Sequence, residues 1–351
     1  MRSDQTTGDN SIAVVAKGAV SIHTGVSVAD VKEIFRDMMR DAMVGIQREA
    51  RHEAEQRNEK LVDDLLSRAQ DRFGEQIEEK LAGFKDPGAQ YAFKQAQNGY
   101  CRYGDNEAKD NAIELILDRI SNNYESDFNV IVDDAIEKAA RLSSRQVDFL
   151  CLIFSLFSHP PINISNLENF NKYLSYISEV SSELPIRESD LSMLKIHGLI
   201  VDHSATRHWM DIEDIIRQRF WGLLAKGFDP NSVDFDTSNR ELFLPCLRAP
   251  TMMQANNVQL APWRERLLNA GISEEKVQEI VNICEKSTMN KEDIATLLDK
   301  YSTNFQKLRD DFAEDGPIKY SKLTTVGTAI AFSKAKRSGL YEHLSMRDLI
   351  A

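Results

Sequence analysis

Residues 145–157 read RQVDFLCLIFSLF, and this stretch decides how the chain folds. Nearly every position of its FLCLIFSLF part is apolar, so a helix formed here is apolar on all sides and belongs at the centre of a domain. The run is roughly half the length that crosses a bilayer. The pair Ser143-Ser144 precedes it as a candidate N-cap, and His159-Pro160-Pro161 ends it. We therefore expect a mainly α-helical protein built around this helix.

Helical patterns on the N-terminal side of this helix predict a bundle over residues 86–158. Pro87 suits the first turn of a helix that carries aromatic side chains further along. Asn111–Ile120 and Val130–Ala140 repeat apolar residues at helical spacing. We place a domain boundary at His159, because the prolines that follow it cannot continue the helix.

A long helix, or two abutting helices, is predicted over residues 27–85. Apolar residues recur at three- and four-residue steps before and after a polar middle, Gln47–Lys60. The apolar stripe consists of Val28, Val31, Phe35, Met38, Ala42 and Ile46, followed by Leu61, Leu65, Phe73, Ile77 and Leu81. Such a polar middle is typical of a solvated stalk, and a helix that leaves its domain usually meets other copies or a partner.

Residues 1–26 are predicted to form a short β-ribbon, because apolar residues alternate on both sides of Lys17-Gly18. Two strands of this length form at best a marginal hairpin in isolation. We expect copies from neighbouring subunits to complete the ribbon, and packing on the chain's own helical domain is the alternative. The residues expected to carry oligomerisation are Ile12, Val14, Val20, Ile22, Val31, Phe35 and Met38.

Residues 159–351 are predicted to form a winged-helix-like domain with a helical insertion at about 205–315. Leu191 and Leu194 have helical spacing, Gly198 suits a left-handed C-cap, and the chain then turns to a strand. The returning strand and the last long helix are expected far downstream, within Gly316–Gly339. Thr324 or Thr325 is the expected N-cap of that helix, which continues to Ser338.

The insertion is predicted to be helical at both ends and irregular in the middle. A helical pattern covers Met210–Phe228, and a proline-bounded stretch without clear periodicity follows over Asp229–Pro262. Two further helices are expected near residues 273–287 and 291–313.

The charge balance disfavours general attraction to nucleic acid or anionic lipid. The 55 acidic residues exceed the 43 basic ones and give a formal net charge of −12, whereas phosphate binding needs basic surface. A winged-helix nucleic-acid-binding regulator is the alternative function. Its basic surface would come from Lys319, Lys322, Lys334, Lys336 and Arg337.

The four cysteines, Cys101, Cys151, Cys246 and Cys284, lie far apart and form no CxxC pair. This spacing indicates reduced thiols rather than a disulfide framework or a zinc site. Cys151 lies in the middle of the central helix among apolar residues, where a thiol is hard to ionise. The first residues also lack a basic-then-apolar signal sequence. We expect a cytoplasmic protein without a membrane span.

The densest group of potential metal ligands is DHSATRHWMD, which contains Asp202, His203, His208 and Asp211. Their spacing does not match a helical pair of histidines with a following carboxylate, and Asp211 equally suits a helix N-terminus. The chain has no GxSxG, Walker-type or strand-anchored GxGxxG motif. We predict no catalytic residue and no cofactor. An enzyme that uses this cluster is a third hypothesis.

Four segments together resemble a family of bacterial proteins that carry only locus-tag names and no described activity. The segments are GDNSIAVVAKGAVSIHTGVSVADVKEIF, DPGAQYAFKQAQNGYCRYGD, LSSRQVDFLCLIFSLF and KLTTVGTAIAFSKAKR, in that order. The resemblance covers most of residues 8–160 and the last 35 residues, and it supplies no catalytic residues. The GDNS ribbon is also similar to short N-terminal segments that precede unrelated domains in bacterial phage-defence proteins.

These observations favour a non-enzymatic, self-assembling cytoplasmic protein. The resemblance of the ribbon implies a sensor or scaffold component of bacterial anti-phage defence. The expected partners are other copies of the chain, and another protein of a defence system or a phage component. The sequence favours protein contacts over nucleic acid for the winged-helix-like domain, since its presumptive third helix carries as many acidic as basic residues.

Overall fold

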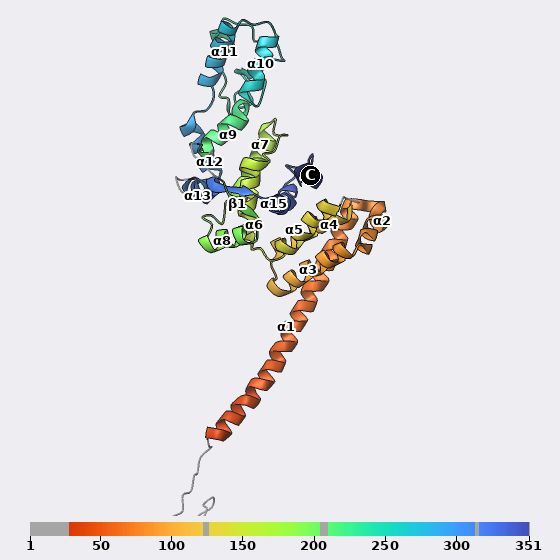
Figure 1. Cartoon of the computed structure of the whole chain (residues 1–351). Helices are drawn as coiled ribbons and strands as arrows, with labels where there is room; N and C mark the ends of the chain where they lie inside the picture. Colours follow the sequence, from red (N-terminus) through yellow and green to blue (C-terminus); the bar gives the residue numbers. More distant parts are fainter. Residues whose placement is uncertain (1–27, 122–125, 204–209, 313–315, 351) are drawn as a thin grey trace, which may run out of the picture. The chain divides into compact units, whose positions relative to one another are not determined.

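The computed structural model describes residues 28–121, 126–203, 210–312 and 316–350 (Figure 1). For residues 28–31, 34–35, 38–46 and 126 it describes the backbone only. The described chain is mainly helical, with two small two-stranded sheets. It divides into compact units after Glu53, and the second unit is Ala54–Ala351. Among the described helices, none combines the length and the apolar character that a bilayer crossing requires.

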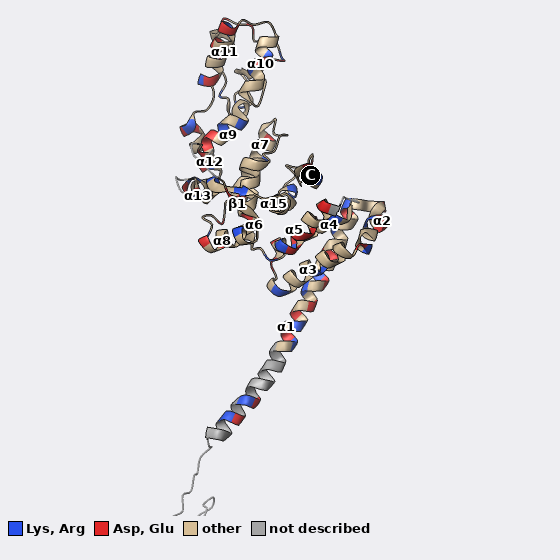
Figure 2. Ribbon diagram, viewed as in Figure 1, with Lys and Arg blue, Asp and Glu red and all other residues tan. Residues whose placement is uncertain are grey.

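The long N-terminal helix α1 extends over Val28–Phe73. It ends at Gly74, whose φ of +53° is a left-handed conformation that glycine adopts without a steric penalty. Three short helical segments follow: a 3₁₀ turn at Gly74–Gln76, α2 at Ile77–Leu81, and a second 3₁₀ turn at Ala82–Lys85. Basic and acidic residues are mixed along the described part of α1 (Figure 2).

A helical bundle surrounds the apolar helix predicted at residues 145–157. Its members are α3 (Pro87–Tyr103), α4 (Asn106–Ser121), α5 (Ser126–Ala139), α6 (Ser144–Ile153) and α15 (Thr325–Lys336). Every residue from Gln146 to Leu156 is buried, which confirms the central position of this stretch. Ser143 caps α6 in a reciprocal capping box with Gln146. The helix continues as a π-helical turn over Phe154–Ser158.

The last long helix belongs to the same core as the first bundle. α15 packs against α4, α5 and α6, although about 170 residues separate it from α6 in sequence. Both predicted domains, 86–158 and 159–351, lie within the second unit and contribute to one continuous hydrophobic core. The C-terminal segment α16 (Met346–Ile350) packs on α15.

The strand pairing expected across the insertion is present. After α7 (Leu167–Val180) and α8 (Glu188–Ile196), β1 (Ile200–Asp202) pairs antiparallel with β4 (Ser321–Leu323). The short helix α14 (Pro317–Tyr320) leads into β4, and the side chain of Thr324 caps α15. Gly327 must lack a side chain, because a Cβ there would lie 2.0 Å from the carbonyl oxygen of Leu199. Main-chain contact therefore fixes α15 against the α8–β1 turn.

The insertion differs from its prediction in three places. The helix expected over Met210–Phe228 ends at Phe220, and a 3₁₀ turn to Leu224 follows it. The stretch expected to be irregular to Pro262 contains a small hairpin, and α10 begins two residues before that proline, which occupies its first turn. The single helix expected near residues 291–313 is broken at Ser302-Thr303. The elements are α9 (Ile212–Phe220), a 3₁₀ turn at Trp221–Leu224, a 3₁₀ turn at Pro230–Ser232, β2 (Phe243–Pro245), β3 (Met253–Ala255), α10 (Leu260–Asn269), α11 (Glu274–Lys286), α12 (Lys291–Tyr301) and α13 (Asn304–Asp311).

Part of the insertion forms a lobe with its own core, residues 226–287. Trp221, Phe243 and Trp263 are among the side chains that fill this second core. The chain enters and leaves the lobe through a neck, where Ala225 and Thr288 form an antiparallel bridge. Two further backbone hydrogen bonds of 2.7 and 3.0 Å flank this bridge, so the two ends of the lobe lie side by side.

Candidate functional site

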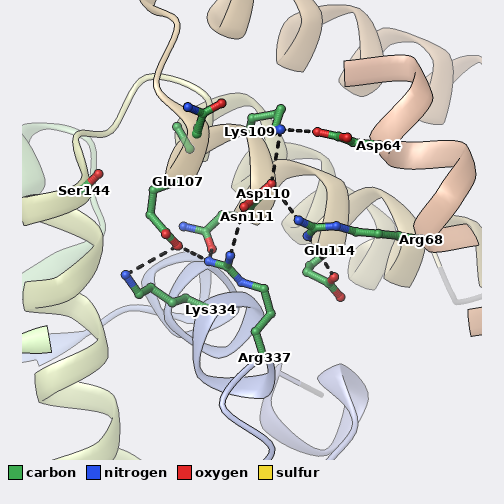
Figure 3. A network of polar contacts seen from close by, with 12 residues as sticks. Asp64, Arg68, Glu107, Lys109, Asp110, Asn111, Glu114, Ser144, Lys334 and Arg337 are labelled. Atoms are coloured by element: carbon green, nitrogen blue, oxygen red, sulfur yellow. Dashed lines mark hydrogen bonds and ion pairs between the residues drawn. The ribbon is translucent and has the colours of Figure 1, made fainter. Parts of the chain in front are cut away.

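A stripe of acidic side chains on α4 connects two helices that are distant in sequence. Glu107, Asp110, Glu114 and Asp118 are spaced by three, four and four residues, which places them along one side of the helix. Cations from α1 and α15 contact this stripe (Figure 3). We call this group the α4 network.

The C-terminal half of α1 supplies the first set of cations. An Arg68 Nη atom lies 2.7 Å from an Asp110 oxygen, and Arg68 also lies 3.4 Å from Glu114. One turn later, Arg72 pairs with Asp118. Lys109 of α4 contacts Asp64 of α1 in the opposite sense, since here α4 carries the cation. These pairs attach the buried end of α1 to α4.

The C-terminal end of α15 supplies the second set. Arg337 pairs with Glu107, lies 3.5 Å from Asp110 and donates a 2.8 Å hydrogen bond to Asn111. Lys336 lies 3.2 Å from Asp118. Asp110 and Asp118 are therefore each shared between a cation of α1 and a cation of α15. The α4 network ties both helices to one acidic stripe.

One ion pair of this region is almost fully buried. Lys334 of α15 lies 2.6 Å from Asp148 of α6, and the two side chains are 8% and 9% exposed. Burial raises the pKa of Asp148 to about 6, although the charge of Lys334 opposes the rise. Burial also acts to lower the pKa of Lys334, but Asp148 raises it further and the net shift is upward. Lys334 therefore stays charged and neutralises the interior carboxylate.

Glu107 completes this arrangement. Burial tends to raise the pKa of Glu107, but the charges of Arg337 and Lys334 together hold it below its usual value. In this network each cation thus lies beside a carboxylate. Paired, mutually neutralising charges of this kind position helices and offer no activated nucleophile or general base.

The residues predicted to carry oligomerisation are not placed at side-chain level. Ile12, Val14, Val20 and Ile22 lie outside the described residues. Val31, Phe35 and Met38 lie on α1, but their side chains are outside the described part of the chain. The structure describes the polar middle that follows them, and residues 47–53 are exposed at every position.

The predicted metal-ligand cluster is distributed over separate interactions. Asp202 pairs with Lys195 at 2.6 Å, and Asp211 pairs with Lys291 and caps the start of α9. The backbone N–H of His203 donates to the backbone carbonyl oxygen of Tyr320, and His208 lies outside the described residues. Within the described ranges, no group of three His, Cys, Asp or Glu side chains is arranged to hold a metal ion.

Most of the basic residues assigned to the nucleic-acid alternative contact the protein itself. Lys334, Lys336 and Arg337 belong to the α4 network or its buried pair. Lys319 is buried and lies 5.7 Å from the ring centre of Phe312. Lys322 is exposed on β4. These contacts speak against a continuous basic surface on the last helix.

All four cysteines are free thiols. Burial raises the pKa of Cys151 to about 12 and that of Cys284 to about 12, so both thiols stay protonated near neutral pH. Burial also raises the pKa of Cys101, which is partly exposed. None of these three thiols has the lowered pKa of a nucleophilic cysteine.

One family model matches residues 25–347 of the chain, and its description reads only ":-like". The chain belongs to this family. No curated protein and no solved structure matches it significantly. The match reaches from the start of α1 to α16, so membership extends across the insertion as well as the bundle. Because the description names no activity, function must be inferred from the residues.

Proposed function

We propose that the protein is a non-enzymatic, self-assembling scaffold or sensor whose N-terminal segment joins copies of the chain. The observation that supports this most is the division of α1 into parts of different character. Leu65 and Ala69 are buried in the main core and Leu61 is also buried, whereas residues 47–53 are exposed on every face of the helix. A helix that is polar on all sides buries no core of its own. We infer that this part of α1 serves as a connection between the N-terminal segment and the second unit.

The sequence of α1 before this exposed part supports contact with like chains. Before the exposed part, the sequence of α1 has apolar residues at helical spacing: Val28, Val31, Phe35 and Met38. Burying such a stripe against equivalent helices removes apolar surface from water, at roughly 25 cal/mol per Å². The ribbon in residues 1–26, which is too short to be stable alone, is then completed by its copies.

A second set of contacts is proposed for the winged-helix-like part of the molecule. The support for this assignment is that β1 pairs with β4, while α8 contacts β1 and α15 contacts β4. We propose that these elements are the third helix, the wing strands and the closing helix of such a domain. Three apolar side chains are exposed here among polar ones: Met193, Ile196 and Val201 are 44%, 77% and 48% exposed. Apolar surface of this kind suits a protein partner better than a nucleic acid.

The setting we propose is bacterial anti-phage defence. Its support is the resemblance of the GDNS ribbon to N-terminal segments of phage-defence proteins. The partner of the winged-helix-like surface is then another protein of a defence system, or a phage component. The acidic net charge of −12 is compatible with such protein contacts.

The solution mass of the full chain tests the assembly. We expect an oligomer in sedimentation-velocity experiments at micromolar concentration. A Val31→Glu/Phe35→Glu variant is expected to be a monomer, because charges within the stripe cannot be buried without partners. The matched control is Lys32→Glu/Arg36→Glu, which changes exposed neighbours on the same helix and should keep the oligomer mass.

Two results contradict the proposal. The first is a monomeric full chain at all concentrations up to the solubility limit. The second is an oligomer whose mass the stripe variant leaves unchanged, since the assembly would then use another surface. Circular dichroism of both variants checks that the second unit stays folded.

A further inference from the structure

A cavity of about 630 Å³ lies beside the lobe of the insertion. One part of its wall comes from α9 and the 3₁₀ turn after it, including Arg217 and Trp221. The other part comes from the start of α10, including Leu260 and Ala261. This volume is in the range of pockets that bind small organic molecules.

Two donors in this wall have no acceptor in the described part of the chain. Trp221 is 4% exposed, and its indole N–H makes no hydrogen bond there. The Nε–H of Arg217 is also buried without an acceptor, and Arg217 forms no ion pair with a described carboxylate. Leaving a buried donor unsatisfied is unfavourable, and more so when the group is charged. Both N–H groups are closed off from water in this structure, so a small shift of the cavity wall opens them to an acceptor that a ligand brings in.

The start of α10 adds further positive potential to the same cavity. Gln259, the N-cap residue, makes no side-chain capping bond, so the first N–H groups of this ten-residue helix keep their capacity to donate. Pro262 in the first turn has no N–H, which leaves Leu260 and Ala261 as the donors nearest the cavity. A helix N-terminus attracts negative charge.

The other charged side chains of the wall are already engaged, with one exception. Arg219 donates to the carbonyl oxygens of Ser155 and Leu156, and Arg264 pairs with Glu274. Asp214 accepts from the backbone N–H of Asp211. Glu285 is the remaining carboxylate of the wall, and it favours a ligand that also carries a hydrogen-bond donor.

We propose that this cavity binds a small organic anion, a carboxylate or a phosphate monoester that also bears a hydroxyl or amino group. The anionic group accepts from Arg217, from Trp221 and from the N-terminus of α10. The hydroxyl or amino group donates to Glu285. This site is independent of the assembly proposed above, because it uses only residues of the insertion.

Titration calorimetry on the full chain at constant ionic strength tests the site. The probes are glycerol 3-phosphate, citrate and inorganic phosphate. We expect glycerol 3-phosphate or citrate to bind with a Kd of about 1 mM or below, and inorganic phosphate, which lacks the organic part, to bind more weakly. The first two probes separate a phosphate ligand from a carboxylate ligand.

Variants show whether binding uses the proposed donors. Arg217→Gln should weaken binding about 10-fold or more, since a hydrogen bond to a charged group contributes about 1.5–3 kcal/mol. Arg217→Lys keeps the charge, and its affinity should lie between those of Arg217→Gln and the unaltered chain. Trp221→Phe keeps an aromatic ring without the N–H and should weaken binding several-fold. Arg240→Gln, which changes an exposed arginine of the same lobe, should leave the affinity unchanged.

The proposal is overturned if none of the three probes binds at concentrations up to about 20 mM. It is also overturned if the Arg217→Gln variant binds like the Arg240→Gln control. If Arg217→Gln loses both binding and thermal stability, the loss of binding could come from partial unfolding. Arg217→Lys and Trp221→Phe then decide between unfolding and the loss of a ligand contact. If both of these bind as tightly as the unaltered chain, the site is not the one described.

Discussion

The α4 network and the cavity beside α10 both place charged groups inside the protein, but they satisfy them differently. In the network each cation from α1 and α15 lies beside a carboxylate, and two carboxylates serve a cation from each helix. In the cavity wall, Arg217 and Trp221 have donors with no acceptor among the described residues. The network also contains buried polar atoms without a hydrogen-bond partner, such as Asn111 Nδ2 and Asp118 Oδ2, so the difference lies in charge pairing. The cations of the network have carboxylate partners within the chain, whereas Arg217 is left for a ligand.

The largest effect is expected when one partner of the buried pair is removed. Lys334→Met leaves Asp148 in the core without its cation, and we expect the free energy of unfolding to fall by about 3–5 kcal/mol. Urea unfolding at pH 7.5 measures this loss. If the variant is as stable as the unaltered chain, the pairing does not hold the helices together and the comparison fails.

Two controls test whether the loss of stability comes from leaving a buried charge without its partner. Lys334→Met/Asp148→Leu removes both charges and should recover most of the lost stability, because apolar residues of similar volume replace a buried pair well. Lys172→Met breaks the exposed pair with Glu168 on α7 and should leave the free energy of unfolding nearly unchanged.

A smaller effect is expected at Gly222, next to Trp221 of the cavity wall. A Cβ on Gly222 would lie 1.7 Å from the carbonyl oxygen of Asn257, so Gly222→Ala must push apart the turn after α9 and the segment before α10. We expect a loss of about 3 kcal/mol and weaker binding of the anion probes. Thermal unfolding and the same calorimetric titration measure both.

Gly271→Ala is the matched control for this variant. Gly271 has a φ of +82° but open space around its Cβ position, so alanine there should cost only about 1 kcal/mol and leave probe binding intact. Equal effects of the two alanines would mean that the close approach at Gly222 does not shape the cavity.

The smallest effect concerns Asp311, a buried acidic side chain for which the described part of the chain supplies no ion pair. Asp311, at the end of α13, is buried, and one of its oxygens has no partner within the described ranges. Burial raises its pKa to about 6, above the value of about 3.9 in an unfolded chain. The native state therefore holds a proton that the unfolded state has lost, and the stability contributed by Asp311 is lost as the pH rises through about 6.

Asp311→Asn removes this titration. We expect the variant to be more stable than the unaltered chain by about 2–3 kcal/mol at pH 8, with the difference disappearing near pH 4. Urea unfolding midpoints of both proteins across this pH range measure the difference in stability. The other titrating groups contribute equally to both proteins and therefore cancel. A difference that does not depend on pH would show that the carboxyl of Asp311 is not held neutral by burial.

Local sequence patterns predicted much of the fold. The apolar run at residues 145–157 gave the central helix, and the capping residues Ser143 and Thr324 marked where α6 and α15 begin. The left-handed Gly198 between α8 and β1 was also predicted from the sequence. The apolar run, the caps and this glycine could be predicted because each lies within a few residues of the feature it determines. The short strands β2 and β3 were missed, since three residues carry too little periodicity to show a strand.

The polar sites depend on long-range contacts, and the sequence did not show them. Lys334, Lys336 and Arg337 were interpreted as a basic surface, but their carboxylates come from α4 and α6, about 190 to 230 residues away. The sequence analysis recognised only the apolar pattern of α4 and missed its acidic stripe, whose partners lie far away in the sequence. The cavity was hidden for the same reason, since Arg217 and the start of α10 meet only after the lobe has folded back.

The neck at Ala225 and Thr288 makes the lobe an exchangeable module. Because the polypeptide departs and returns at neighbouring points, residues between them can be lengthened, shortened or replaced during evolution while the flanking helices keep their positions. Trp221 lies just before Ala225, outside the lobe, whereas Glu285 and the start of α10 lie within it. A change of module would therefore alter what the cavity recognises and leave the surrounding scaffold the same.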